Sequence, residues 1–150
     1  MMKPSSISPD EALRDFLRGK IDVGQPGGLT QKVAIYSDWE RPTNELPTDF
    51  IVIYINGDIE GVSMDTNFAK GYIMVNLYCK MNDDGSVKKN RVQKILAQFD
   101  DLIEKCVTGV YHFEYDVQRF ITPTSPNQTS GYSVTSLNLR WHTTNNFNTE

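Results

Sequence analysis

Residues 86–108, SVKKNRVQKILAQFDDLIEKCVT, carry the clearest structural signal in the chain. Apolar side chains recur in them at the i, i+3, i+4, i+7 spacing that places residues on one face of an α-helix. These side chains are Val92, Ile95, Leu96, Phe99, Leu102, Ile103 and Cys106. The turn-forming residues Asp83 to Ser86 precede the pattern, and Gly109 follows it. The stretch therefore predicts a long helix from Ser86 to Thr108, capped at its start, with one buried face.

The charges of this predicted helix are arranged against its dipole. Its first turns are basic and its last turns are acidic, with Lys88, Lys89 and Arg91 followed by Asp100, Asp101 and Glu104. A helix dipole favours the opposite order by about 0.3–1 kcal/mol per charge. The simpler interpretation is a solvated face that tolerates this small cost. The alternative is that a partner protein supplies the counter-charges.

The segment before the helix alternates in polarity from Tyr72 to Lys80, which predicts a β-strand. One face is aliphatic and contains Ile73, Val75, Leu77 and Cys79. The other face contains Tyr72, Met74, Asn76, Tyr78 and Lys80. We expect the aliphatic face to bury the apolar stripe of the helix. A face rich in Tyr and Met is typical of surfaces that meet partners.

The remaining pattern predicts a second helix and four further strands. Ser8 and Glu11 form a capping box for a helix from Pro9 to Arg18. The predicted strands are Val33–Tyr36, Phe50–Ile55, Tyr111–Gln118 and Ser133–Trp141. Residues 50–55 are apolar on both faces, which indicates a strand covered on both faces or lying at a subunit contact.

These elements predict one α+β domain over residues 1–150. We expect a mostly antiparallel sheet of about four to five strands, with two helices packed on one of its faces. The segments 1–8 and 143–150 are expected to be flexible termini.

Two of the predicted connections between strands are long. The first, Asp58–Lys70, has about a dozen residues and contains the apolar side chains Ile59, Val62, Met64 and Phe68. The second, Pro123–Gly131, is polar, rich in turn formers and expected to be mobile. Long loops are commonly functional or flexible. We expect the first loop to dock its apolar residues on a partner and the second to make looser polar contacts.

Composition excludes several classes of protein. The chain has 150 residues, 15 Lys and Arg against 19 Asp and Glu, and a formal net charge of −4. Mild acidity disfavours a sequence-independent grip on DNA or on an anionic membrane. No apolar run approaches the roughly 20 residues needed to cross a bilayer, and residues 1–9 lack the apolar core of a secretory signal. Two cysteines allow at most one disulfide bond.

The residue types that can carry catalysis are scattered along the sequence. His112 and His142 are single histidines on or after strands, and Cys79 and Cys106 fall on predicted core faces. The glycine-rich segment 24–28 lacks the Gly-Lys-Ser/Thr of a phosphate-binding loop. The carboxylates in residues 58–65 do not have the spacing of a calcium loop. We therefore expect no enzyme activity, no metal, no cofactor and no disulfide.

The order and lengths of these elements resemble the tail-terminator and tail-completion proteins of long-tailed bacteriophages, which join tail to head. The resemblance covers residues 9–143 and rests on three places. They are the helix 9–18 with its Gly/Pro-rich loop, the strand 72–80 that leads into the helix 86–108, and the late segments 110–122 and 132–143 with their polar connection.

This resemblance implies a small α+β subunit of a ring, commonly a hexamer, at the junction of tail tube and head. Its partners would be further copies of itself and other phage tail or neck proteins. It would act in the virion or in the host cytoplasm during assembly, in a phage or a prophage remnant. It implies no sequence-specific nucleic-acid binding, no membrane and no cofactor. The interface residues that we expect are Ile59, Val62, Met64, Phe68, Tyr72, Tyr78, Lys88, Lys89, Arg91, Asp100, Asp101 and Glu104.

A different class of protein is also compatible with the pattern. The chain could be a stand-alone bacterial α+β binding module that recognises a small ligand or a peptide on the Tyr-rich face of its sheet. A closed, convergent pocket would favour the binding module. A ring in solution would favour the phage subunit.

Overall fold

The computed structural model describes residues 8–24, 31–37, 47–63, 68–106, 111–116, 123–124 and 131–143. Helices and strands follow one another in the order α1 (Pro9–Leu17), β1 (Ala34–Ser37), β2 (Asp49–Ser63), β3 (Phe68–Lys80), α2 (Lys89–Glu104), β4 (Tyr111–Tyr115), β5 (Pro123–Thr124) and β6 (Tyr132–Thr143). Neither helix is long and apolar enough to cross a membrane.

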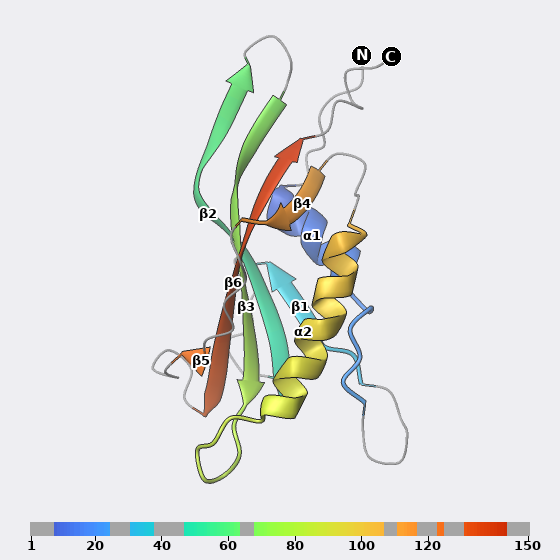
Figure 1. Ribbon diagram of the computed structural model, residues 1–150, viewed down its shortest axis with the longest axis vertical. Coiled ribbons are helices and arrows are strands. Elements are labelled where there is room, and N and C mark those ends of the chain that lie inside the picture. The colour runs from blue at the N-terminus through green and yellow to red at the C-terminus, as the bar shows by residue number, and fades with distance from the viewer. Residues whose placement is uncertain are drawn as a thin grey trace.

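The strands form one sheet in the order β1-β2-β3-β6-β4, and the short β5 pairs with β6 (Figure 1). β1 runs parallel to β2, and every other pair is antiparallel. The predicted α+β class, with a mostly antiparallel sheet, is confirmed. The long strands β2, β3 and β6 form the centre, because their alternating or wholly apolar sequences suit positions that are flanked on both sides.

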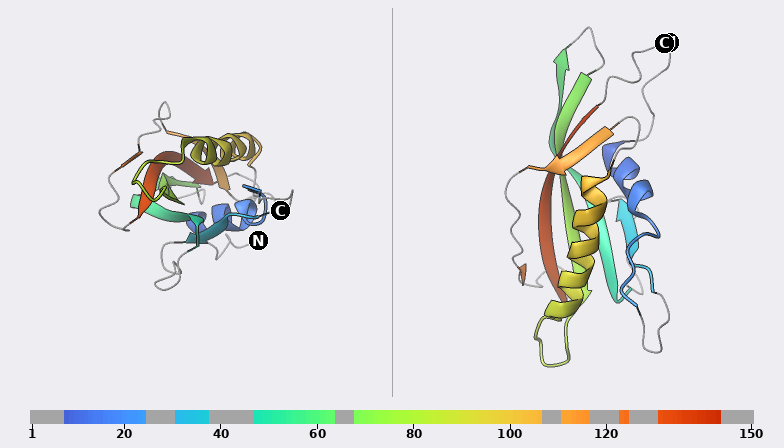
Figure 2. Two further views of the ribbon diagram at one scale, coloured as in Figure 1. Left: turned by 90° about the horizontal axis from the view of Figure 1, so that it is seen from below. Right: turned by 45° about the vertical axis from the view of Figure 1, so that its right-hand side comes forward.

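Both helices pack on one face of the sheet and share a single core with it (Figure 2). α1 contributes Leu13 and Leu17 to this core. α2 contributes the predicted stripe, and the sheet contributes the aliphatic side of its strands, including Ile53, Ile73, Val75, Leu77, Leu137 and Leu139. The 3.6-residue periodicity of the helix and the alternation of β3 therefore meet as predicted.

The opposite face of the sheet contains a second, smaller core near one end. Phe50, Val52, Tyr78, Tyr132 and Val134 are buried together there. The rings of Phe50 and Tyr78 stack with centroids 4.7 Å apart, and Tyr132 meets Phe50 edge-on at 5.6 Å. This cluster explains why residues 50–55 are apolar on both faces. It also corrects one expectation, because Tyr78 is 1% exposed and is buried within the chain's own core rather than at a surface.

The predicted loop over residues 58–70 is wrong. β2 continues to Ser63 and β3 begins at Phe68, so most of the segment extends the β2–β3 hairpin. The pairing is interrupted between Asn56 and Glu60, and again between Gly61 and Ser63. Glycine and aspartate weaken strands in local propensity, but cross-strand hydrogen bonds and a bulge accommodate them here.

Helix α2 begins at Lys89, three residues later than predicted, and its N-cap Lys88 makes no side-chain capping bond. The predicted cap, Ser86, is used elsewhere. Its backbone N–H and hydroxyl both donate to Asp84 Oδ1, at 2.9 and 2.6 Å, which closes a local turn. The helix ends at Glu104, and the predicted stop at Gly109 lies outside the described residues. In α1, by contrast, the capping box forms, and Ser8 N–H donates to Glu11 Oε1 at 3.2 Å.

The last strands differ from expectation at their ends. β4 stops at Tyr115, whereas β6 extends from Tyr132 to Thr143 and so includes the first residue of the expected tail. Pro123 and Thr124, expected in a mobile loop, pair with Thr135 and Val134 of β6. The rest of that loop, residues 125–130, lies outside the described part of the chain.

Candidate functional site

Two rows of polar residues cross the sheet on the face opposite the helices, beyond the second core. The strand register aligns Lys70 of β3 with His142 of β6 and His112 of β4. The next row aligns Tyr72 of β3 with Arg140 and Glu114. Because neighbouring residues on one face of a strand are two apart, these rows are adjacent and form one polar patch.

A pocket of about 300 Å³ lies in this patch. Its lining is Lys70, Gly71, Tyr72, Glu114, Arg140, Trp141 and His142. Tyr72 is 42% exposed, and the other large hydrophobic side chains that the structure describes are more buried. Arg140 donates from Nη2 to Glu114 Oε1 at 3.0 Å, and its Nε lies 3.7 Å from Asp116 Oδ1. The pocket therefore combines an aromatic ring with two cations and one carboxylate.

Gly71, which lines the pocket, packs directly against the ring of Trp141. A side-chain carbon at Gly71 would lie 2.9–3.0 Å from ring atoms of Trp141. Trp141 is buried in the main core and meets Tyr111 edge-on, with ring centroids 5.5 Å apart. The indole ring occupies the space that a side chain at position 71 would need, so glycine is required by close packing.

The two histidines form a cross-strand pair at the edge of the patch. Their ring centroids are 5.0 Å apart. Partial burial lowers the pKa of His142, and the neighbouring His112 lowers it further. The neutral form of His142 is therefore favoured more strongly than that of an unperturbed histidine.

We expect acid to destabilise the fold through His142. Its pKa in the folded chain lies below the value of 6.5 for an unperturbed histidine. The unfolded state therefore takes up the proton first, and stability that is complete above pH 6.5 is lost as the pH falls through the folded pKa. Melting temperatures at pH 7 and pH 5.5 should differ less in His142→Gln than in the parent chain. Equal losses in the two proteins would remove His142 from the explanation.

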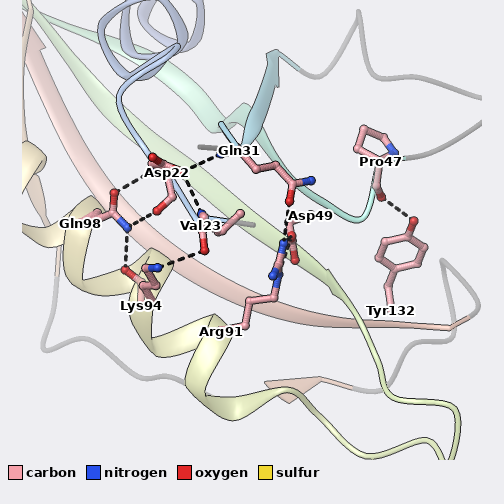
Figure 3. Close-up of polar contacts among 10 residues, drawn as sticks. Asp22, Val23, Gln31, Pro47, Asp49, Arg91, Lys94, Gln98 and Tyr132 are labelled. Atoms are coloured by element: carbon pink, nitrogen blue, oxygen red, sulfur yellow. Dashed lines mark hydrogen bonds and ion pairs between the residues drawn. The ribbon is translucent and has the colours of Figure 1, made fainter. Parts of the chain in front are cut away.

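The start of α2 is fixed to the start of β2 by an ion pair (Figure 3). Arg91 Nε donates to Asp49 Oδ2 at 2.7 Å, and Arg91 Nη2 lies 2.5 Å from the same oxygen. The Asp49 side chain is 2% exposed and that of Arg91 is 25% exposed. Burial raises the pKa of the neighbouring Cys79 thiol, and the Asp49 carboxylate raises it further. Asp49 therefore supplies a counter-charge to Arg91 from within the chain.

A second polar network attaches the segment after α1 to the middle of α2 (Figure 3). The Gln98 side chain accepts from Asp22 N–H at 2.9 Å and donates to Asp22 O at 2.8 Å. Lys94 Nζ donates to Val23 O at 3.0 Å. Backbone N–H groups of Gln31 and Gly24 donate to the Asp22 carboxylate and lower its pKa. These hydrogen bonds connect the segment after α1 to residue 31 and to α2, so the network has a structural role.

The acidic end of α2 is also compensated within the chain. Tyr115 O–H donates to Asp100, and Lys105 Nζ lies 3.1 Å from Asp101 Oδ2. Burial, followed by the charge of Glu104, raises the pKa of Tyr115 to about 12. Arg91 and Asp101 thus have oppositely charged partners within the chain, and Asp100 accepts a hydrogen bond from Tyr115. The alternative that a partner protein supplies counter-charges to this helix stays a prediction. Lys89 and Glu104 are exposed and Lys88 is half-buried at the helix start.

The other predicted interface residues lie on or near the hairpin. Ile59 and Val62 belong to β2, Phe68 begins β3, and Met64 lies outside the described residues. Tyr72 alone combines a described position, exposure and a pocket. The partners of Tyr72 in that pocket, Glu114 and Arg140, were not predicted as site residues. The alternation of polar residues along each strand predicted only that Glu114 and Arg140 lie on polar faces. The pairing of β4 with β6 places the two residues opposite each other.

Both cysteines are buried, as their positions in the pattern predicted. Burial raises the pKa of Cys106 to about 12, which makes it a packing residue at neutral pH. Within the described part of the chain, no three His, Cys, Asp or Glu side chains are grouped as metal ligands.

The chain was compared with known proteins. No protein-family model matches it, and no curated protein matches it significantly.

Proposed function

We propose that the chain is a structural subunit that completes a phage tail or joins the tail to the head, assembling as a ring through protein–protein contacts. The observation that carries this proposal is the far end of the β2–β3 hairpin, residues 56–72. We call this segment the arm. In Figure 1 the end of β2 and the beginning of β3 extend past the end of β6.

Among the residues that the structure describes, the arm loses its flanking strands one after the other. β1 pairs with β2 only as far as Ser37 and Ile53. β6 pairs with β3 only as far as His142 and Lys70. From Gly61 to Ala69 the described residues of the arm are therefore paired only with each other, through the pairs Gly61–Ala69 and Ser63–Phe68.

A two-stranded ribbon of this kind is marginally stable by itself, because it needs further strands or a packed layer to bury a face. The two interruptions of its pairing bend the ribbon and protect its edges from indiscriminate strand addition. The arm nevertheless contains Ile59, Val62, Met64 and Phe68 in its sequence. Apolar residues in the sequence of a ribbon that has lost its flanking strands suit a contact with another protein.

A closed ring requires two different surfaces on each subunit, because its contacts run head to tail. The arm provides one such surface. The acidic net charge of −4 suits a conduit for DNA, since an acidic lumen does not retain a passing polyanion.

The test shortens the arm without touching the cores. Residues 61–69 are replaced by Asn-Gly, which joins the paired residues Glu60 and Lys70 by a two-residue hairpin turn. We expect circular dichroism to show a folded protein and tail completion to fail. A matched variant keeps the arm length but replaces Val62, Met64 and Phe68 with threonine, and it should fail in the same assay. Normal tail completion by both variants would exclude the arm from the function.

A further inference from the structure

We propose that the polar pocket on the open sheet face binds a small planar oxyanion, meaning a flat ring that carries a carboxylate or a phosphate. The binding residues are Tyr72, Arg140 and Lys70, with Glu114 acting as an internal competitor for Arg140. Lys70 and Tyr72 lie at the base of the arm, and the other binding residues lie on β4 and β6. The proposal goes beyond the assembly function.

The size of the pocket fits this class of ligand. About 300 Å³ is at the lower end of the range for small-molecule sites. It is too large for a single water molecule, which occupies about 30 Å³ in the liquid, and large enough for one ring with an anionic group. The lining comes from the three strands β3, β6 and β4, so the site is held by paired backbone rather than by a loop.

The lining chemistry accounts for both halves of the ligand. Tyr72 offers an aromatic face that is 42% exposed, whereas the other large hydrophobic side chains of the described residues are more buried. Lys70 and Arg140 offer cationic donors beside it. Flat rings stack on such aromatic faces, and carboxylates and phosphates pair with guanidinium and ammonium groups.

Glu114 competes with a bound anion for Arg140. It accepts from Arg140 at 3.0 Å, and both side chains are about half exposed at 47% and 49%. An exposed ion pair of this kind is weak, so an arriving anion can replace the carboxylate at little cost. Removing the Glu114 charge should therefore tighten binding, whereas removing the Arg140 charge should weaken it.

Isothermal titration of the full chain tests the proposal with three probes: adenosine 5′-monophosphate, benzoate and inorganic phosphate. We expect one of the two ring-bearing probes to bind saturably and more tightly than inorganic phosphate. Which of them binds distinguishes a nucleotide from an aromatic carboxylate as the ligand. Arg140→Gln should weaken that binding about tenfold or more, the loss expected for a charge-assisted hydrogen bond. Tyr72→Ala and Lys70→Gln should each weaken it several-fold.

Glu114→Gln should strengthen binding. Lys105→Gln removes a lysine that directly follows α2 and does not line the pocket, so it should leave binding unchanged. All these side chains are at least partly exposed, so melting temperatures will show whether each variant folds. No saturable binding of either ring-bearing probe would overturn the proposal. Binding that Lys105→Gln weakens as much as Arg140→Gln would also overturn it, because the attraction would then be a general effect of charge.

Discussion

Replacing Phe99 with alanine is expected to reduce the free energy of unfolding by about 3–5 kcal/mol, as large truncations in cores do. Phe99 is 1% exposed on the inner face of α2, and its ring centroid lies 6.5 Å from that of Tyr115. The truncation removes contacts to the sheet and leaves a cavity that the rigid strands cannot fill. Chemical denaturation measures the change.

Gln93→Ala is the matched control for Phe99→Ala. Gln93 lies on the exposed face of the same helix, so its truncation should change stability by about 0.5 kcal/mol or less. A Phe99→Ala variant that unfolds at the same denaturant concentration as the parent would contradict the packing of α2 on the sheet.

Asp49→Ala should cost a similar amount, about 3–5 kcal/mol, because it leaves Arg91 without its buried partner. The Asp49 Oδ1 atom is itself buried without a hydrogen-bond partner among the described residues, so the pair is already costly to desolvate. Replacing both residues by apolar ones, as in Asp49→Leu with Arg91→Met, should therefore recover much of the loss. Denaturation of Asp49→Leu, of Arg91→Met and of the double variant measures the coupling between the two side chains.

Glu114→Ala provides the comparison for the Asp49 series. It breaks the exposed pair with Arg140 and should cost about 1 kcal/mol or less. If the double variant at positions 49 and 91 is as unstable as the sum of its single variants, the ion pair is not the link between α2 and β2.

The parts of the fold that were predictable have strong local periodicity. The stripe of α2 and the alternation of β3 each specify a buried face without knowledge of the rest of the chain. The apolar run at residues 50–55 indicated cover on both faces, and the second core around Phe50 provides it. The error over residues 58–70 came from the same local reasoning, because Gly57, Asp58 and Gly61 are turn formers that here lie in an interrupted ladder.

The candidate site could not be predicted, because its residues are far apart in the sequence. Arg91 and Asp49 are 42 positions apart, and Arg140 and Glu114 are 26 positions apart. No local pattern pairs such residues; only the strand order does. Tyr78 shows the reverse error, since its alternation with Tyr72 predicted a shared exposed face. The face changes along β3 from buried at Tyr78 to open at Tyr72.

Site-specific photo-crosslinking from the arm tests the central claim most directly. A photoreactive residue is placed at Val62 in the arm or, as the control, at Gln93 on the exposed face of α2, and tails are assembled with either protein. The account predicts covalent adducts from position 62 to a second copy of the chain or to a tail protein, and few from position 93. Completed tails without adducts from position 62, or a genetic locus without other phage structural genes, would contradict it.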